Sequence, residues 1–97
     1  MANKSNLKKI TPQIVETLKK NKIKKASIFG SFARGEDNKN SDVDVLIETK
    51  KGMSLFGFVG IKLELEDKLG RKVDLVTYKS LHPYLRKKIL DEEVRII

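Results

Sequence analysis

The chain has 97 residues, which is the size of one compact domain, and we expect residues 1–97 to form a single domain. It contains no cysteine and one histidine, which excludes a disulfide framework, a thiolate metal site and a multi-histidine metal site. No stretch approaches the roughly 18 consecutive apolar residues of a membrane span, and the first residues lack an apolar signal core. We therefore expect a cytoplasmic protein with no membrane partner.

The net charge of +8 is concentrated near the start of the chain. Residues 1–25 hold eight lysines and one glutamate, whereas the remaining residues hold thirteen basic and twelve acidic side chains. A basic face can bind nucleic acid or another polyanion. However, no aromatic side chain interleaves with these lysines, as a surface for single-stranded nucleic acid requires. We interpret the segment as a solvated helix face and expect no nucleic-acid partner.

The first predicted element is a helix that begins at Thr11 and Pro12. Threonine is a favoured N-cap, and proline is favoured at the first helical position. An apolar stripe at helical spacing supports the helix and extends backwards from it, and it consists of Leu7, Ile10, Ile14, Val15 and Leu18. Asn21 and Lys22 end the predicted helix.

The later elements alternate between strands and helices. In chain order they are a strand at 25–29, a polar turn-rich segment at 30–40 opened by a short helix, a strand at 43–47, a helix at 55–69, a strand at 71–77, a helix at 83–90 and an edge strand at 94–97. Ser54 is the expected cap of the helix at 55–69, and Gly70 is expected to end it. This order predicts an α/β (α+β) fold, in which helices pack on a small mixed β-sheet.

Two aspartates enter the second predicted strand two residues apart. Side chains alternate along a strand, so Asp42 and Asp44 should point from the same face. Two carboxylates held that close repel each other unless a cation lies between them, and Mg²⁺ is commonly bound by one or two carboxylates together with substrate phosphates. Asp74 lies in the third predicted strand, where an unpaired acid is costly to bury, and it could complete a triad.

A glycine-rich turn follows the first predicted strand. Gly30 allows a phosphate to approach closely, and the short helix that begins there presents backbone N–H groups to an anion. Ser31 adds a hydroxyl donor. Arg34, one helical turn later, could contact phosphate or form a structural ion pair. A glycine–serine turn followed by the paired carboxylates predicts a nucleotide-binding site with metal ions.

The residues GSFARG at 30–35, followed by SDVD at 41–44, resemble the signature of the DNA polymerase β-like nucleotidyltransferase superfamily. The length is similar to that of the minimal nucleotidyltransferases, the MNT group, which act as antitoxins paired with HEPN-domain toxins. The resemblance covers nearly the whole chain. Many members carry arginine where this chain has Phe32, although hydrophobic residues also occur there.

This resemblance implies a minimal polymerase β-like fold and the transfer of AMP from Mg²⁺-bound ATP to a hydroxyl group. It implies that Gly30 and Ser31 hold the terminal phosphates of ATP, and that Asp42 and Asp44 bind two metal ions. It also implies that Asp74 completes the site by assisting the attacking hydroxyl. In the antitoxin group the acceptor is a tyrosine of the HEPN toxin, which is the partner that the resemblance implies.

Two alternatives remain at the level of sequence. The chain could be a non-catalytic antitoxin that neutralises its toxin by binding alone, which its small size favours. It could also transfer a nucleotide to a small molecule or to an RNA end, although enzymes of that kind usually carry extra domains that hold the acceptor.

Overall fold

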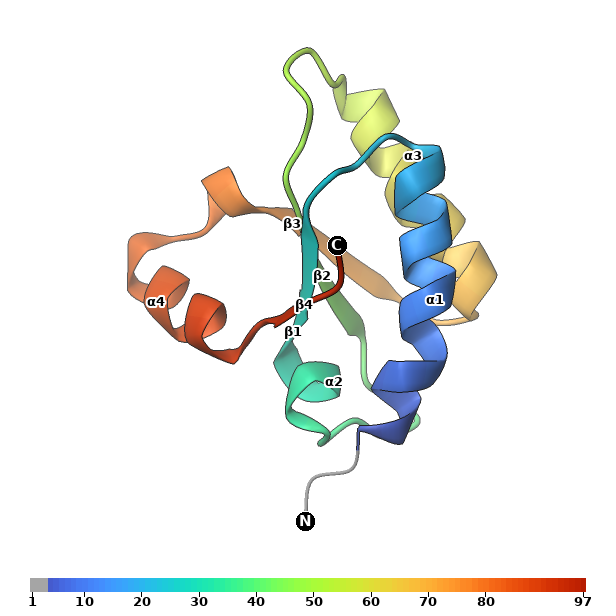
Figure 1. Cartoon of the computed structure of the whole chain (residues 1–97), viewed down its shortest axis with the longest axis vertical. Helices are drawn as coiled ribbons and strands as arrows, with labels where there is room; N and C mark the ends of the chain where they lie inside the picture. Colours follow the sequence, from blue (N-terminus) through green and yellow to red (C-terminus); the bar gives the residue numbers. More distant parts are fainter. Residues whose placement is uncertain (1–3) are drawn as a thin grey trace.

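A computed structural model describes residues 4–97, in which helices pack on a four-stranded sheet (Figure 1). The predicted order of elements is confirmed, with one added 3₁₀ turn. The elements are α1 (Ser5–Lys20), β1 (Ala26–Phe29), α2 (Gly30–Arg34), β2 (Val43–Ile47), α3 (Leu55–Leu69), β3 (Val73–Thr77), the 3₁₀ turn η1 (Tyr78–Ser80), α4 (Pro83–Glu92) and β4 (Val94–Arg95).

The sheet is mixed, as predicted, with the strand order β3-β2-β1-β4. β1 pairs antiparallel with both β2 and β4, whereas β2 pairs parallel with β3. α3 makes the crossover that a parallel pair of strands requires. This topology places β1 and β2 in the middle of the sheet, where the glycine turn and the acidic strand become neighbours.

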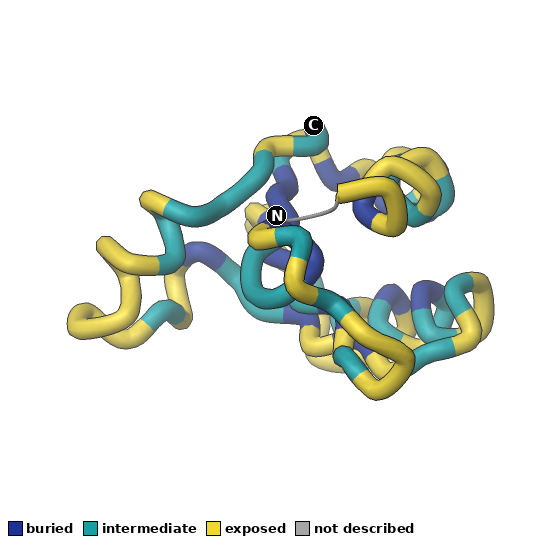
Figure 2. Tube along the Cα trace, turned by 90° about the horizontal axis from the view of Figure 1, so that it is seen from below, coloured by how far each residue is buried: buried dark blue, intermediate teal, exposed yellow. Residues whose placement is uncertain are grey.

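The hydrophobic core lies between one face of the sheet and the helices α1 and α3, which lie side by side (Figures 1 and 2). Every second residue of each central strand points into it. The strand residues of this core are Ala26, Ile28, Val43, Val45, Ile47, Val73 and Leu75, and the helices contribute Leu7, Ile14, Leu18, Ile61 and Leu65. The alternate strand residues therefore point to the opposite face.

The predicted start of the first helix is wrong. α1 begins at Ser5, so Pro12 lies inside the helix and Thr11 is not its N-cap. Proline cannot donate the hydrogen bond that the carbonyl of Lys8 would accept. The Thr11 hydroxyl donates to the Leu7 carbonyl at 2.6 Å, and the Leu7 side chain is buried in the core. Tertiary packing of Leu7 therefore outweighs the local proline signal.

The boundaries of α3 agree with the prediction at both ends. The Ser54 hydroxyl accepts a hydrogen bond from the Gly57 amide at 3.0 Å, which caps the first turn. Gly70 follows the last turn in the left-handed conformation, with φ of 66°. Gly70 thus ends the helix where β3 must begin.

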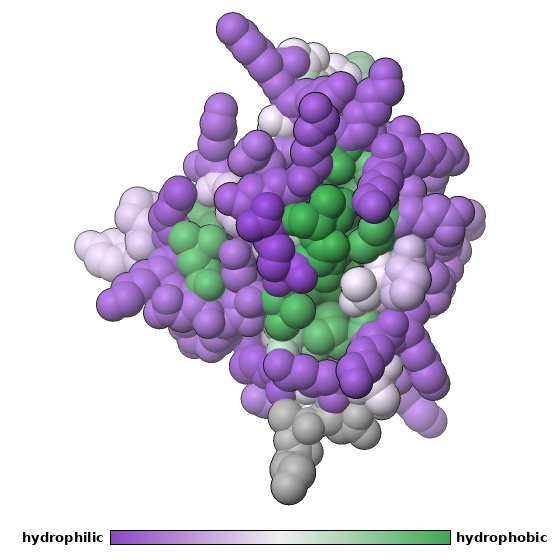
Figure 3. Space-filling view, in the orientation of Figure 1, coloured by the Kyte–Doolittle hydropathy of each residue, from purple (hydrophilic) through white to green (hydrophobic). Residues whose placement is uncertain are grey.

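The remaining surface differs between the two sides of the sheet. α4 buries none of its residues and extends away from the sheet on the side opposite α1 and α3 (Figures 1 and 2). An open apolar groove lies between α1 and the edge strand β4, and Figure 3 shows exposed apolar surface in this region, ringed by hydrophilic side chains. None of the helices formed by residues 4–97 combines the length and the apolar character needed to cross a lipid bilayer.

Candidate active site

Two of the three predicted acids are direct neighbours in the sheet. In the parallel register of β2 and β3, Asp44 lies opposite Asp74, and on its other side Asp44 lies opposite Phe29 at the end of β1. Because Val43 and Val45 point into the core, Asp44 points to the opposite face of the sheet. The two carboxylates therefore share the face that α1 and α3 leave uncovered.

The turn after β1 fits closely against one of these acids. Gly30 has φ of 74°, a left-handed conformation that favours glycine. A Cβ atom at Gly30 would lie 2.1 Å from Oδ2 of Asp44 and 2.9 Å from its carboxyl carbon. Glycine is therefore required at this position both by its backbone conformation and by the approach of the Asp44 carboxyl group.

The surroundings of Asp44 favour its protonated form. Burial above all, and then the nearby negative charges of Asp74 and Asp42, raises the pKa of Asp44 to about 6, whereas Arg34 acts in the opposite direction. These causes place all three predicted acids within electrostatic range of one another. A bound cation would relieve the like-charge repulsion that the structure contains.

The loop before β2 is held by a residue that the sequence interpretation did not single out. The Arg71 guanidinium donates hydrogen bonds to the carbonyls of Ser41 at 2.9 Å and Asn38 at 3.2 Å. It also lies over the ring of Phe32, with its central carbon 5.1 Å from the ring centroid. Arg71 thus connects α2 to the loop that carries Asp42. Its position just before β3 gave no signal in the sequence that it would reach back to this loop.

The departure at Phe32 has a structural explanation. The Phe32 side chain is buried in the core, where it anchors the short helix α2. Many members of the superfamily carry arginine at this position. Here a buried phenylalanine packs under the Arg71 guanidinium and so fixes α2, which begins at the Gly30 turn.

Ser31 and Arg34 lie on α2, beside the acids. No side chain caps the start of α2, so its first backbone N–H groups are free of a capping oxygen. Arg34 forms ion pairs with Glu92 of α4 at 3.3 Å and with Glu36 at 3.4 Å. These pairs are largely exposed and each contributes little to stability. Of the two predicted roles of Arg34, the structure contains the ion pair.

The carboxylate oxygens of the three acids suit a hard cation, although the three side chains are not close enough together to form a complete metal site. No three acidic or histidine side chains of residues 4–97 lie close enough together to hold one metal ion. Carboxylate oxygens without nitrogen or sulfur donors are the ligands of Mg²⁺. Asp44 pressed between Asp74 and Gly30 is consistent with such an ion, and the metal-binding role of the three acids stays a prediction.

A buried polar pair lies on the same face of the sheet, beyond the acids. The hydroxyls of Ser27 and Tyr78 are 2.6 Å apart, and both residues are buried. Burial raises the pKa of the Tyr78 hydroxyl. The ammonium of Lys25 lies 4.6 Å from the centroid of the Tyr78 ring. The Tyr78 carbonyl also accepts a hydrogen bond from Arg86 of α4 at 3.4 Å.

The chain matches a known family over most of its length. Residues 12–97 match the family described as polymerase beta, nucleotidyltransferase. A protein of Methanocaldococcus jannaschii, provisionally named a protein adenylyltransferase, is 46% identical over 92 residues, which are 95% of this chain and 99% of the relative. The protein adenylyltransferase MntA of Thermococcus cleftensis is 38% identical over 74 residues, which are 76% of this chain and 75% of the relative.

Solved structures have the same fold. A chain provisionally named a minimal nucleotidyltransferase superimposes with a TM-score of 0.80 at 32% identity, and the match covers 95% of this chain and 94% of that one. A chain from a toxin–antitoxin complex with AMP-PNP gives 0.79 at 22% identity, covering 90% of this chain and 72% of that one. A chain from the complex of a tri-AMPylated Shewanella oneidensis HEPN toxin with its MNT antitoxin gives 0.73 at 18% identity, covering 93% and 71%.

Proposed function

The chain belongs to the polymerase β nucleotidyltransferase family, and on this premise we propose that it transfers AMP from ATP to a hydroxyl of a cognate HEPN toxin and so acts as its antitoxin. The names of the two relatives support AMP transfer to a protein. The toxin–antitoxin complexes among its structural neighbours support a HEPN partner. We propose a tyrosine as the acceptor, in line with the resemblance of the signature.

One observation carries the proposal. Asp44 lies beside Asp74 in the sheet and against the backbone of Gly30, so the predicted phosphate turn and the predicted metal-binding acids meet at one point. Neither Asp44 nor Asp74 forms an ion pair with another of residues 4–97. The half-buried Asp44 carboxylate beside the exposed Asp74 costs stability, and the left-handed glycine costs conformational freedom.

The residues of this site have separable roles in the proposed reaction. The backbone N–H groups at Gly30 and Ser31 bind the terminal phosphates of ATP and orient its α-phosphorus toward the acids. Asp42, Asp44 and Asp74 would hold Mg²⁺, which when bound neutralises the charge that develops on the phosphate oxygens.

The proposed transfer is balanced in atoms and charge. The acceptor oxygen forms a bond to the α-phosphorus, the bond from that phosphorus to the oxygen bridging to the β-phosphate breaks, and pyrophosphate leaves. The Asp74 carboxylate, on the open face of the sheet, accepts the proton of the acceptor hydroxyl. Positioning and charge, with no covalent intermediate on the protein, account for the reaction.

The direct test is label transfer in a lysate of the source cells. The purified protein is incubated with Mg²⁺ and with ATP labelled at the α-phosphate or, in parallel, at the γ-phosphate. We expect one protein band labelled from the α position alone. We also expect the double variant Asp42→Asn, Asp44→Asn to lose the label. Glu48→Gln is the matched control, because Glu48 follows the other end of β2 and is exposed.

Each other outcome contradicts a defined part of the proposal. Label from the γ position would indicate phosphate transfer, and label in RNA would identify a nucleic-acid end as the acceptor. If toxin is present and stays unlabelled while the chain still neutralises it, the chain acts by binding alone. The same conclusion follows if the double variant protects cells from the toxin as well as the unmodified chain does.

A further inference from the structure

A hollow at one end of the molecule, which we call the lysine hollow, is lined largely by lysines. It has a volume of about 510 Å³, and the residues around it are Lys19, Lys22, Ile23, Lys24, Lys50 and Ile97. All four lysines are exposed, and none forms an ion pair with any of residues 4–97. The backbone oxygen of Ile97 accepts a hydrogen bond from the Arg95 side chain. Within the described chain no acidic side chain lines the hollow, so the protein does not neutralise these four charges.

The four lysines come from three separate segments. Lys19 lies at the end of α1, and Lys50 lies in the loop after β2. Lys22 and Lys24 lie between α1 and β1. The partial negative charge at the end of a helix favours nearby cations, which accounts for Lys19 and Lys22. It does not account for Lys24 and Lys50, and like charges brought together repel unless an anion lies between them. The convergence of the four ammonium groups therefore points to an anionic ligand.

Lys22 has a backbone conformation that favours glycine. Its φ is 63°, and among residues 4–97 it is the one non-glycine residue with a positive φ. The other described positions of positive φ are occupied by Gly30, Gly35, Gly52 and Gly70. A side chain at a left-handed position costs conformational energy that glycine avoids. Lysine is thus less favourable than glycine for the fold at this position, which indicates that its side chain has a use outside the fold.

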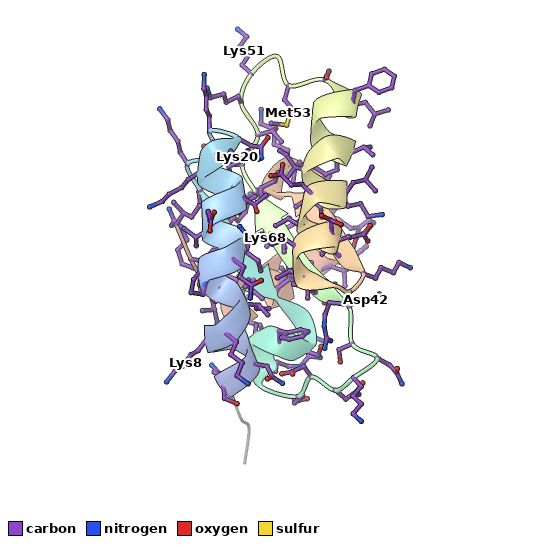
Figure 4. All side chains as sticks on the ribbon, turned by 90° about the vertical axis from the view of Figure 1, so that its right-hand side faces the viewer. Lys8, Lys20, Asp42, Lys51, Met53 and Lys68 are labelled. Carbon is purple, nitrogen blue, oxygen red and sulfur yellow. The ribbon has the colours of Figure 1, made fainter. Side chains whose placement is uncertain are left out.

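The lysine hollow is separate from the acidic site. Lys24 precedes β1, whereas Gly30 follows it, and the six residues from one to the other span about 20 Å of extended chain. Figure 4 shows Lys51, the neighbour of Lys50, at the upper end of the molecule and Asp42 in its lower half. An anion in the hollow would therefore leave the acids open. A phosphate at the Gly30 turn would not reach the hollow.

The chemistry of the hollow suits several phosphate groups held close together. A lysine ammonium binds phosphate as a point charge, and four of them around one hollow favour an anion of several charges. The volume is within the range of sites for small ligands. No aromatic side chain of residues 4–97 lines the hollow, so a nucleic-acid base would find no surface to stack on. A compact polyphosphate, such as a triphosphate, fits these features better than a single-stranded nucleic acid.

We propose that the lysine hollow is a second anion site, which binds a compact polyphosphate through its phosphate groups alone. Because the ligand binds the folded chain, it should raise the thermal midpoint of unfolding. Because the attraction is electrostatic and the lysines are exposed, added sodium chloride should weaken it. The proposal does not depend on AMP transfer, so Asp42→Asn, Asp44→Asn should bind the ligand as the unmodified chain does.

Nuclear magnetic resonance locates the ligand. The isotope-labelled chain is titrated with inorganic triphosphate in the presence of EDTA, so that no Mg²⁺ holds the probe at the acids. We expect saturable shifts of the backbone amides at Lys22, Lys24 and Lys50, and unchanged amides at Gly30 and Ser31. Shifts confined to Gly30 and Ser31, or no saturable shift at all, would overturn the proposal.

Calorimetry of single variants tests the role of the lysines. Lys50→Gln should raise the dissociation constant of triphosphate about 5-fold, because it removes one charge of the hollow. Lys87→Gln is the matched control: it removes the same charge from an exposed position on α4 and should change the constant less than about 2-fold. Lys22→Gly should weaken binding about as much as Lys50→Gln yet raise the urea midpoint of unfolding, since glycine relieves the left-handed strain. Equal effects of Lys50→Gln and Lys87→Gln would show that net charge alone attracts the anion, and the proposal would be wrong.

A short RNA duplex is the competing probe. Lys8 lies in the first half of α1, outside the hollow. If the duplex binds more tightly than triphosphate at physiological salt, and Lys8→Gln weakens it as much as Lys50→Gln does, the lysines along α1 form a nucleic-acid surface. That result would overturn the compact site. A duplex that fails to displace triphosphate supports it.

Discussion

The two faces of the sheet are built from alternate residues of the same strands, yet they do different things. On the core face, Ile28, Val45 and Leu75 are apolar and buried beneath α1 and α3. On the other face, the neighbouring positions include Asp44 and Asp74, whose carboxyl groups have no basic side chain bonded to them. Burial of the core face stabilises the fold, whereas holding the acids close together on the open face destabilises it.

This division separates the consequences of substitution. A change on the core face should alter the free energy of unfolding and affect the chemistry only through it. A change on the open face should alter the chemistry directly and can even raise stability. The predictions below test whether this separation holds, beginning with the position at which both effects meet.

Gly30→Ala should have the largest effect, because the new Cβ would collide with the Asp44 carboxyl group. We expect label transfer to fall at least about 100-fold, since displacement of a positioned group by about 1 Å is enough for a loss of this size. We also expect destabilisation of about 2 kcal/mol or more from left-handed strain and the clash. Label transfer and urea unfolding measure the two effects.

Gly70→Ala is the matched control for this prediction. Gly70 has a similar φ of 66°, but a Cβ atom there would meet nothing within 4 Å. We expect it to lose about 1–2 kcal/mol of stability and to keep label transfer. If Gly70→Ala loses transfer as completely as Gly30→Ala, strain alone explains the effect, and the contact with Asp44 is unimportant.

Adjacent residues of β1 provide the next comparison. Ile28 faces the core, and Ile28→Ala should cost about 2–5 kcal/mol through the cavity that it leaves. Ser27 faces the other way, and Ser27→Ala should cost only about 1 kcal/mol, because it removes the hydrogen bond to the Tyr78 hydroxyl. Equal losses in urea unfolding would show that the two faces are not energetically distinct.

Much of this architecture could be predicted because the signals were local. Ser54 and Gly70 cap α3 as their residue types indicate, and β2 has the predicted bounds of 43–47. The pairing of Asp44 with Asp74 was a hypothesis from the sequence, since register is not a local property. The structure brings these two acids together in the parallel register.

The features that could not be predicted depend on tertiary contacts. Thr11 and Pro12 gave a correct local signal for a helix start, and packing of Leu7 overrode it. Arg71 donates a hydrogen bond to the carbonyl of Ser41, thirty residues earlier in the chain. The hydrophobic periodicity of the sequence cannot predict a contact between residues this far apart. Leu55, Phe56, Val59 and Leu63 on the outside of α3 are exposed, and which face of this helix is exposed depends on how it packs on the sheet.

The smallest expected effect is an increase in stability, whereas most substitutions lower the stability of a protein. The folded-state pKa of Asp44 is about 6 against an ordinary value of 3.8, so the folded chain binds this proton more tightly than the unfolded chain. Stability should therefore fall as pH rises from about 4 to about 6, and the penalty should persist above that range. Asp44→Asn removes the penalty. At pH 7 without divalent cations it should raise the free energy of unfolding by about 1 kcal/mol, after allowing for solvent screening.

Thermal unfolding at several pH values checks this sign, with the exposed Asp91→Asn on α4 as a control that should change little. At a pH below 4 the gain from Asp44→Asn should vanish, because the carboxyl is then protonated in both states. Added Mg²⁺ should stabilise the unmodified chain at pH 7 and leave Asp44→Asn unaffected, because the variant lacks one of the proposed ligands. If Asp44→Asn destabilises the metal-free chain at pH 7, the acids of the open face are not held at a cost, and the contrast between the two faces fails.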